Sequence, residues 1–299
     1  NLANRILEGA FAAAGAQVHY ASPGFANPVR ALLFYRFLRR HQFDAVMSLN
    51  GVFGGLPLAL ALAARVPIRI GWHRRSTPAY RQTLGRRLYA RLSLALLERA
   101  STRILSNSQA ALDYFHGEHW RNSDRYAVIP NGVDAERFRP RPEMRLRKRE
   151  KLGIAQDEWV IGHVGRVDPA KDHETLFAIV KALRQTHPEV RLLMVGTGTD
   201  RDEIHARLEH HGIADITLGL GVRDDVHHLY NAMDVFVFPS ITEGQPNALI
   251  EAMLSGIDVM ASDIAPIKAS VPTAIQHQLF APKDVSSAVT VAGKLKRKG

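Results

Sequence analysis

Two short segments of the chain place charged side chains in loops that directly follow apolar, strand-like stretches. In the first segment the apolar stretch ends at Gly165, and Arg166 and Lys171 follow it five residues apart. A guanidinium is a planar fork of donors and an ammonium is a compact point charge, so the two can converge on one anion. Two unrelated cations on a solvated surface loop would give the same pattern, and this reading stays open.

The second segment, residues 237–256, carries two glutamates around a predicted helix start. Glu243 lies in a loop with Gly244, and Glu251 lies about one turn into the helix that is expected to begin near Asn247. Both carboxylates could serve only as helix-dipole or capping groups. Near a phosphate they would repel it, unless hydroxyl groups such as those of sugar and ribose donate hydrogen bonds to them.

The start of this helix is the second half of the same site. The first backbone N–H groups of a helix have no partner inside it, and they attract anions. We expect unsatisfied N–H groups at Asn247, Ala248 and Leu249. Together with the basic pair they predict a site for a diphosphate.

The elements that must hold these loops alternate along the chain. Strands are predicted at residues 16–22, 44–50, 66–73, 101–108, 126–132, 158–167, 190–198, 216–221, 234–240 and 258–263. Helices are predicted at residues 28–41, 80–100, 174–185, 201–211, 226–232 and 247–255. Strands that alternate with helices indicate parallel, doubly wound sheets.

A basic, proline-containing stretch at residues 131–152 interrupts this alternation and predicts a linker followed by a short exposed helix. Two α/β domains are therefore predicted, at residues 1–140 and 141–299. Ligands of such folds bind at the carboxyl ends of the strands. The charged residues described above all follow strands of the second domain, so we expect the site there, beside a cleft between the domains.

Composition excludes several classes of protein. The chain has 299 residues, of which 46% are hydrophobic and 23% charged, and it contains no cysteine. Disulfide scaffolds, thiolate nucleophiles and cysteine zinc sites are excluded, and a reducing, cytoplasmic compartment is favoured. No apolar run reaches the 18 or so residues needed to span a bilayer. Because the sequence begins with Asn1 inside a helix-like stretch, we expect truncation at the N-terminus and also at the C-terminus.

The charge is unevenly distributed. Residues 1–150 hold 24 Lys and Arg against 10 Asp and Glu, a net charge of +14, and the remainder holds 15 against 19, or −4. A solvated basic surface would account for this, and so would an anionic partner. No paired Cys/His ligands and no RNP-like motif are present, so nucleic acid is not expected. An anionic membrane surface, bound peripherally, is the better candidate.

Four motifs in order resemble the family 4 retaining glycosyltransferases of GT-B fold. They are the Glu243/Glu251 pair with seven residues between, residues 162–176 (GHVGRVDPAKDHETL), residues 128–138 (VIPNGVDAERF) and residues 225–240 (DVHHLYNAMDVFVFPS). The resemblance is strong from about residue 100 to 285 and weak before. It implies two Rossmann-like domains facing across a cleft, and transfer of a hexosyl unit from a nucleoside-diphosphate sugar to an acceptor hydroxyl with retention.

The resemblance also implies roles for individual residues. Arg166 and Lys171 match the pair that contacts the donor diphosphate, Glu243 the residue that holds sugar hydroxyls, and Glu251 the one that binds ribose. Further donor-binding positions match at Gly165, Gly196, Val222, Gly244, Asn247, Ala248 and Leu249, with residues 196–199 and 221–225 lining the nucleobase. His73 matches a cleft histidine, so the expected catalytic set is Glu243, Arg166, Lys171 and His73. No metal or other cofactor is expected, because the cations and the helix start take the charge.

Two departures from the family pattern concern the ends of the chain. The family's first strand with its glycine-rich loop would precede Asn1, and the C-terminal helices that return to the first domain would mostly follow Gly299. The expected acceptor is a carbohydrate or a lipid-linked intermediate of cell-surface polysaccharide or glycolipid synthesis. Open alternatives are a nucleotide-sugar epimerase or a glycogen-synthase-like polymerase on the same fold, and a non-catalytic nucleotide-sugar-binding homologue.

Overall fold

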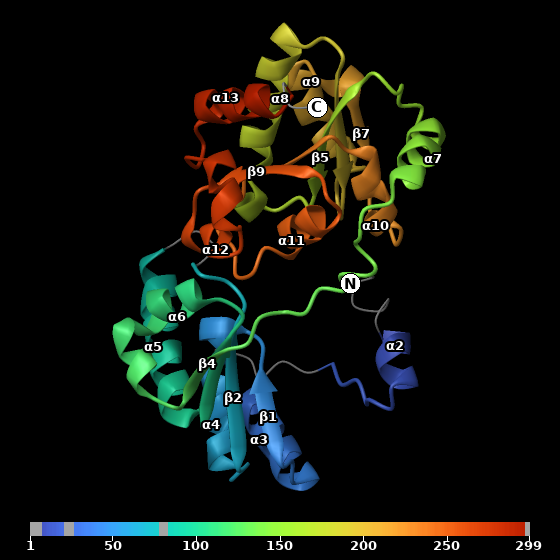
Figure 1. Cartoon of the computed structure of the whole chain (residues 1–299). Coiled ribbons are helices and arrows are strands. Elements are labelled where there is room, and N and C mark those ends of the chain that lie inside the picture. The colour runs from blue at the N-terminus through green and yellow to red at the C-terminus, as the bar shows by residue number, and fades with distance from the viewer. Residues whose placement is uncertain (1–7, 21–26, 78–82, 297–299) are drawn as a thin grey trace. The chain divides into compact units, whose positions relative to one another are not determined.

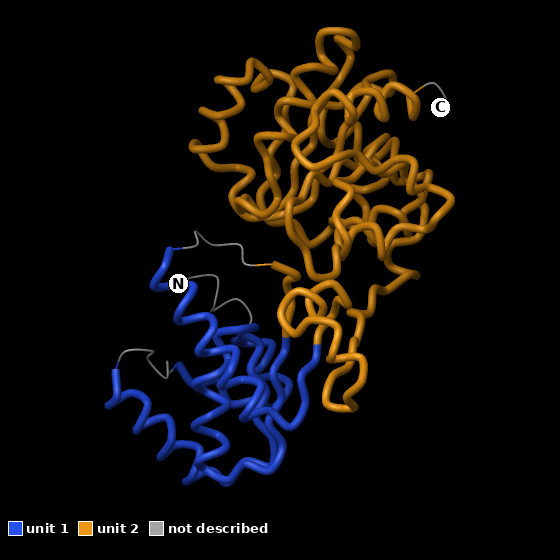
Figure 2. The backbone as a smooth tube through the Cα atoms, turned by 90° about the vertical axis from the view of Figure 1, so that its left-hand side faces the viewer, with its two compact units in different colours: residues 1–72, 82–105 blue, residues 73–81, 106–299 orange. Residues whose placement is uncertain are grey.

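The computed structural model describes residues 8–20, 27–77 and 83–296 of the chain. The chain forms two compact units, one of residues 1–72 and 82–105 and the other of residues 73–81 and 106–299 (Figure 2). These units are not continuous in sequence, and a boundary at residue 140 stays a prediction. In the described ranges no helix is both long and apolar enough to cross a membrane.

The smaller sheet has four strands in the order β1-β2-β3-β4, and β1 pairs with β2 in parallel. Its strands are β1 (Ala45–Ser48), β2 (Ile68–His73), β3 (Arg103–Ser106) and β4 (Tyr126–Val128). The helices of this part of the chain are α2 (Glu8–Ala13), α3 (Pro28–His41), η1 (Gly51–Gly54), α4 (Gly55–Ala63), α5 (Leu84–Ala100), α6 (Gln109–His116) and η2 (Glu118–Asn122). The predicted strands at 44–50, 66–73, 101–108 and 126–132 are confirmed.

Local sequence explains where two of these helices begin. The Asn27 side chain accepts a hydrogen bond from the backbone N–H of Arg30, and Pro28 occupies the first turn of α3, where its missing N–H costs nothing. Thr83 caps α5 in the same way. The backbones of α4 and α5 approach closely at Gly55, where a Cβ atom would lie 2.0 Å from the carbonyl oxygen of Ser93.

The larger sheet has six strands in the order β10-β9-β8-β5-β6-β7, with every neighbouring pair parallel. Its strands are β5 (Trp159–Val164), β6 (Val190–Val195), β7 (Thr217–Gly219), β8 (Val235–Phe238), β9 (Asp258–Ser262) and β10 (Leu279–Phe280). Counted from β5, this is the strand order of a dinucleotide-binding fold, with its reversal point between β5 and β8. The two-residue strand β10 was not predicted.

Alternating residues of these strands pack on opposite faces of the sheet, as the period of two requires. Ile161, Met194 and Val237 belong to one buried cluster, together with residues of α8, α9 and α13. Val160, Leu193 and Phe236 belong to the other, with residues of α11 and α12. The α-helices, which are labelled in Figure 1, are α7 (Pro142–Leu152), α8 (His173–Thr186), α9 (Asp202–His211), α10 (Val226–Leu229), α11 (Asn247–Leu254), α12 (Ala265–Lys268) and α13 (Val285–Lys296). The short 3-10 helices are η3 (Pro169–Lys171), η4 (Ala214–Ile216), η5 (Tyr230–Ala232) and η6 (Thr273–Gln278).

The helix predicted after the linker is present as α7, but the expectation that it is exposed is wrong at Arg149. This side chain has no solvent-exposed area. Its guanidinium pairs with Asp234 at 2.7 Å and donates to the backbone carbonyls of Ala232, Ala155, Gln156 and Glu158. Ala155, Gln156 and Glu158 lie just after α7, whereas Ala232 and Asp234 lie more than 80 residues away. The basic run in the sequence therefore gave no sign that one of its members is buried.

The strand predicted at residues 16–22 is also wrong as far as the structure describes it. Residues 16–20 have no regular structure and are exposed, and residues 21 and 22 lie outside the described ranges. A strand forms only where a neighbouring strand satisfies its backbone. The local alternation of apolar and polar residues was therefore not sufficient to predict a strand here.

Candidate functional site

The reversal of strand order between β5 and β8 positions the candidate site. Helical crossovers leave in opposite directions from these two neighbouring strands, so the loops that follow them are free to meet at their carboxyl ends. One loop contains Gly165, Arg166 and Lys171, and the other contains Glu243 and Gly244. The structure brings Lys171 and Glu243 into direct contact.

A second feature is a close backbone approach behind these loops. The N–H of Gly165 donates to the carbonyl of Val195, and that of Gly196 donates to the carbonyl of Gly221 at 2.7 Å. Gly196 has φ of +137°, and a Cβ atom there would lie 2.2 Å from the carbonyl oxygen of Gly165. Only glycine fits this position. Val222, the next residue after Gly221, is 74% exposed.

Lys171 and Glu243 form an ion pair with the lysine Nζ 2.6 Å from Oε1 of the carboxylate. Both side chains are largely buried, with 18% and 12% of their areas exposed. The ammonium also lies 4.4 Å from the centre of the Phe238 ring, a favourable cation–π distance. Asp172, with φ of 47°, ends the loop and caps α8 through Thr175. Lys171 is thereby held between a buried strand and a capped helix.

Arg166 has a different partner, so the two cations of the loop do not meet on one group. Its Nε lies 3.1 Å from Oδ2 of Asp168, and the guanidinium of Arg75 lies 3.6 Å from the same oxygen. Asp168 also accepts a hydrogen bond from the N–H of Ala170. Partial burial raises the pKa of this carboxyl, but the Ala170 N–H and the two arginines lower it further, so its pKa is depressed overall. Neither Asp168 nor Arg75 was predicted.

The segment after β2 lies against the loop that carries Glu243. The N–H of Ser76 donates to the carbonyl of Glu243 at 2.9 Å, and the Thr77 and Thr242 hydroxyls are hydrogen-bonded. Gly244 is required here, because a Cβ atom would lie 2.2 Å from the carbonyl oxygen of Arg74.

Helix α11 begins at Asn247 as predicted, but the expectation of three unsatisfied N–H groups is wrong. The N–H of Asn247 donates to the carbonyl of Gln245, and that of Leu249 donates to the carbonyl of Pro246. Of these three N–H groups, only that of Ala248 donates to no backbone carbonyl of the residues that the structure describes. Pro246, at the N-cap position, forms a tight turn in which the carbonyls of Gln245 and Pro246 accept hydrogen bonds from the first turn of the helix.

Gln245 and Asn131 form a contact that sequence reasoning missed. The Gln245 side chain exchanges two hydrogen bonds with the backbone N–H and carbonyl of Asn131. The Asn131 amide in turn donates to the side chain of Asn247 at 3.1 Å. Residue 131 lies in the predicted linker, which is therefore fastened to the start of α11. The sequence pattern around Glu243 and Glu251 indicated a role for the carboxylates only. No residue pattern indicated that the amides of Gln245 and Asn131 would pair.

Glu251 lies on α11, and its Oε2 accepts a hydrogen bond from the hydroxyl of Tyr230 at 2.9 Å. Burial raises the pKa of the Glu251 carboxyl, although the Tyr230 hydrogen bond and Arg137 act against this. Glu243 and Glu251 therefore have separate partners, an ammonium for the first and a phenol for the second.

His73, at the end of β2, is 1% exposed. Its Nε2 lies 3.0 Å from Nε2 of His116, and its ring stacks on Phe115 with centroids 4.9 Å apart. Burial, with a smaller contribution from His116, lowers the pKa of His73 to about 3. His73 is a neutral ring at physiological pH, and His116 was not predicted as its partner.

Both halves of the chain match known families. Residues 144–295 match the family described as Glycosyl transferases group 1, and residues 14–137 match Glycosyltransferase Family 4. The chain belongs to the group 1 glycosyl transferases. The two parallel-sheet α/β folds described above are those expected of the GT-B class.

Two curated relatives and one solved structure illustrate this similarity. EpsF of Bacillus subtilis (strain 168), which is described as a glycosyltransferase, is 29% identical over 260 residues, covering 83% of this chain and 66% of EpsF. The UDP-Gal:alpha-D-GlcNAc-diphosphoundecaprenol alpha-1,3-galactosyltransferase of Escherichia coli is 28% identical over 241 residues, covering 77% of this chain and 60% of that enzyme. The chain thus spans about two thirds or less of the length of these relatives.

The solved structure shows likeness of fold. The crystal structure of Anabaena Alr3699/HepE in complex with UDP-glucose superposes with a TM-score of 0.77 at 20% identity. The superposition covers 98% of this chain and 79% of that protein.

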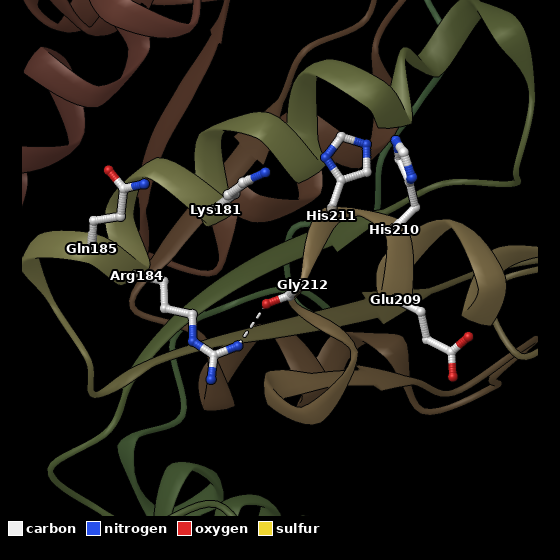
Figure 3. A pocket seen from close by; sticks show the side chains of 7 residues that line it. All are labelled: Lys181, Arg184, Gln185, Glu209, His210, His211 and Gly212. Atoms are coloured by element: carbon white, nitrogen blue, oxygen red, sulfur yellow. Dashed lines mark hydrogen bonds between the residues drawn. The ribbon is translucent and has the colours of Figure 1, made fainter.

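A separate hollow lies between α8 and α9 (Figure 3). It is lined by Lys181, Arg184, Gln185, Glu209, His210, His211 and Gly212. The guanidinium of Arg184 is occupied by the carbonyl of Gly212 and by both oxygens of Asp215, and His211 pairs with Glu174. Across the described residues, no group of three His, Asp or Glu side chains is placed to hold a metal ion.

Three buried histidines make stability sensitive to acid. Burial lowers the pKa of His73 to about 3, that of His173 to about 4 and that of His163 well below its ordinary value. Below about pH 6.5 these histidines bind protons in the unfolded chain but remain neutral in the folded protein. We therefore expect the free energy of unfolding to be highest above pH 6.5 and to fall with pH, by up to about 1.4 kcal/mol per pH unit for each ring.

Urea unfolding at pH 7, 6 and 5 measures this slope. His73→Phe, which keeps an aromatic ring beside Phe115, should flatten the slope. His205→Asn, at a position whose side chain is 64% exposed, should leave it unchanged. A His73→Phe variant with the slope of the native protein would contradict the assignment.

Proposed function

We propose that this protein transfers a hexosyl unit from a nucleoside-diphosphate sugar to an acceptor hydroxyl, with retention of anomeric configuration. Membership of the group 1 glycosyl transferases supports the reaction class. The observation that carries the proposal is the Lys171–Glu243 pair at the strand-order reversal of a dinucleotide-binding sheet. This is where such sheets bind nucleotides.

The donor contacts follow from the local chemistry. Arg166, Lys171 and the N–H of Ala248 in the first turn of α11 would stabilise the negative charge that develops on the leaving diphosphate. The Glu243 carboxylate would accept hydrogen bonds from sugar hydroxyls, and Glu251 from ribose hydroxyls. At Gly165 and Gly196 no side chain covers the backbone, so a ligand would contact the backbone directly. Val222 lies on the loop that is expected beside the nucleobase. No metal is part of the proposal.

In the proposed step the bond from the anomeric carbon to the diphosphate oxygen breaks, and the bond to the acceptor oxygen forms on the same face of the sugar. The acceptor proton passes to the departing phosphate oxygen. Glu243 is already paired with Lys171 and Glu251 with the Tyr230 hydroxyl, so neither glutamate is assigned as a nucleophile. His73, neutral and buried next to the segment that contacts Glu243, is proposed as a hydrogen-bonding group beside the reacting sugar.

We further propose an acceptor that is a carbohydrate or lipid-linked intermediate, used on the cytoplasmic face of a membrane. The E. coli relative is named for a lipid-linked diphosphate acceptor and supports this class. Helix α5 supports contact with the membrane surface. Leu84, Leu88, Leu92 and Leu96, four residues apart, are 85%, 59%, 59% and 41% exposed. At 100° per residue they form one outward stripe, and the exposed Arg87, Arg91 and Arg99 lie along it.

The reaction is tested with UDP-, GDP- and ADP-sugars. We expect one class to raise the melting temperature, to release nucleoside diphosphate slowly without an acceptor, and to give a product of retained configuration by NMR. Lys171→Ala should lose about 2–5 kcal/mol of donor affinity or of activation free energy, because it leaves a buried carboxylate unpaired. Lys181→Ala, an exposed lysine on α8, is the matched control. Donor binding without any turnover would favour the non-catalytic homologue, and normal kinetics of Lys171→Ala would reject the site.

The two glutamates should differ in their kinetic effects. If the sugar contact at Glu243 strengthens as positive charge develops at the anomeric carbon, Glu243→Gln should lower kcat more than donor affinity. Glu251→Gln should mainly weaken donor binding, on the scale of about 1.5–3 kcal/mol for a hydrogen bond to a charged group. Steady-state kinetics with donor Kd values separate these effects, and Glu209→Gln provides an exposed control. Equal profiles for the two variants would defeat this division.

Membrane contact is tested by sedimentation with anionic vesicles. Each well-placed cation near such a surface contributes about 1 kcal/mol, so the bound fraction should fall as salt rises. Leu88→Gln/Leu92→Gln should lower the bound fraction several-fold at low salt. Leu146→Gln removes a leucine of equal exposure, 60%, from α7 and should have no effect. Absence of binding at low salt, or equal losses in both variants, would refute the contact through α5.

A further inference from the structure

Tyr230 is a buried phenol whose hydroxyl is directed at Glu251. It lies on η5, immediately before β8, and has no solvent-exposed area. Its ring packs edge-on against Phe236 at 5.6 Å and against Phe138 at 6.0 Å between centroids. A tyrosine side chain has only two rotatable bonds, and packing on both sides fixes them. The position of its hydroxyl is therefore set by the core.

This hydroxyl has two acceptors and one hydrogen. Its oxygen lies 2.9 Å from Oε2 of Glu251 and 3.0 Å from the carbonyl oxygen of Ala248. A backbone carbonyl and an ionised carboxylate can only accept, so the phenol donates, and its hydrogen bond to the charged carboxylate is the stronger one. The tyrosine thus links the carboxylate of Glu251 to the first turn of α11.

Glu251 on its own would not be held in one orientation. A glutamate has three rotatable bonds, and fixing them costs conformational entropy. Once Oε2 is engaged by Tyr230, the remaining carboxylate oxygen accepts no hydrogen bond from any residue that the structure describes. That oxygen therefore has a defined position and can still accept hydrogen bonds, as a site that binds vicinal hydroxyls requires.

We propose that Tyr230 is a positioning residue that orients the Glu251 carboxylate toward the ribose hydroxyls of the bound nucleotide. The proposal rests on the function proposed above and adds a residue that contacts no substrate. An ordinary core tyrosine contributes to stability through its ring. In Tyr230 the hydroxyl has a further role, because it orients the carboxylate that recognises the ribose hydroxyls.

The test uses two ligands that differ only in the hydroxyls. The probe is whichever of UDP, GDP and ADP stabilises the native protein most, together with its 2′,3′-dideoxy analogue, and calorimetry gives both Kd values. We expect the native protein to prefer the ribose form by about tenfold or more, the ratio that a hydrogen bond to a charged group supplies. In Tyr230→Phe the preference should fall to about threefold or less, through weaker binding of the ribose form alone.

Two controls make the result specific. Tyr114→Phe removes a hydroxyl from an exposed tyrosine on α6 and should keep the full preference. If Tyr230 acts through Glu251, the double variant Tyr230→Phe/Glu251→Gln should bind the ribose form as Glu251→Gln does, within about twofold. Partial unfolding of Tyr230→Phe would scale both Kd values equally, so the ratio stays valid.

The outcomes separate this inference from the proposed function. An unchanged preference in Tyr230→Phe, or additive losses in the double variant, would overturn the role of Tyr230 and leave the function standing. A native protein that binds none of the three nucleoside diphosphates would overturn both.

Discussion

The pairing of β5 with β8 is the constraint on which the candidate site depends. Ile161 and Gly162 are in register with Val235 and Phe236. At Gly162 a Cβ atom would lie 2.0 Å from the sulfur of Met233, so a larger residue would displace the side chain of Met233, which packs in the core just before β8. Asp234, just before β8, also links this strand to β5 and α7, because it accepts a hydrogen bond from the N–H of Val160 and pairs with the buried Arg149. Because these strands are neighbours, the loops that follow them deliver Lys171 and Glu243 to one place.

The charged groups at this place are paired with one another. Lys171 pairs with Glu243, and Arg166 and Arg75 share Asp168. Lys171 and Glu243 are largely buried, and either of these charges without its partner would be far costlier than the pair. A diphosphate with attached hydroxyl-bearing rings offers replacements of both signs at once, phosphate oxygens for the cations and hydroxyls for the carboxylates. The pairs are thus suited to exchange with a ligand that carries both kinds of group. His73 avoids the cost differently, by staying neutral.

Much of the fold was predictable because it depends on local pattern. Nine of the ten predicted strands coincide with β1 to β9, and the boundaries of α3 agree at both ends, with Asn27 and Pro28 as local signals at its start. The strand at residues 16–22 failed for residues 16–20, since a strand also needs a partner that the pattern cannot name. Arg149 failed for a similar reason. Its ion-pair partner Asp234 and the acceptor Ala232 lie more than 80 residues away, and no rule of composition brings that turn to α7.

The sequence by itself determined the family, the alternation of strands and helices, and the residues with unusual chemistry after β5 and β8. These follow from residue types at short spacing, which neighbours along the chain control. Only the tertiary structure decided the partners: Glu243 with Lys171, Arg166 with Asp168 and Arg75, Glu251 with Tyr230, His73 with His116. It also decided that two of the three N–H groups at the start of α11 are already bonded. Most of these pairings join residues that are distant in sequence, as Lys171 with Glu243 and His73 with His116 are. Arg166 with Asp168 and the bonds at the start of α11 are local, but residue types alone do not specify them. All of them depend on burial and on distances of a few ångströms, which the packed structure sets.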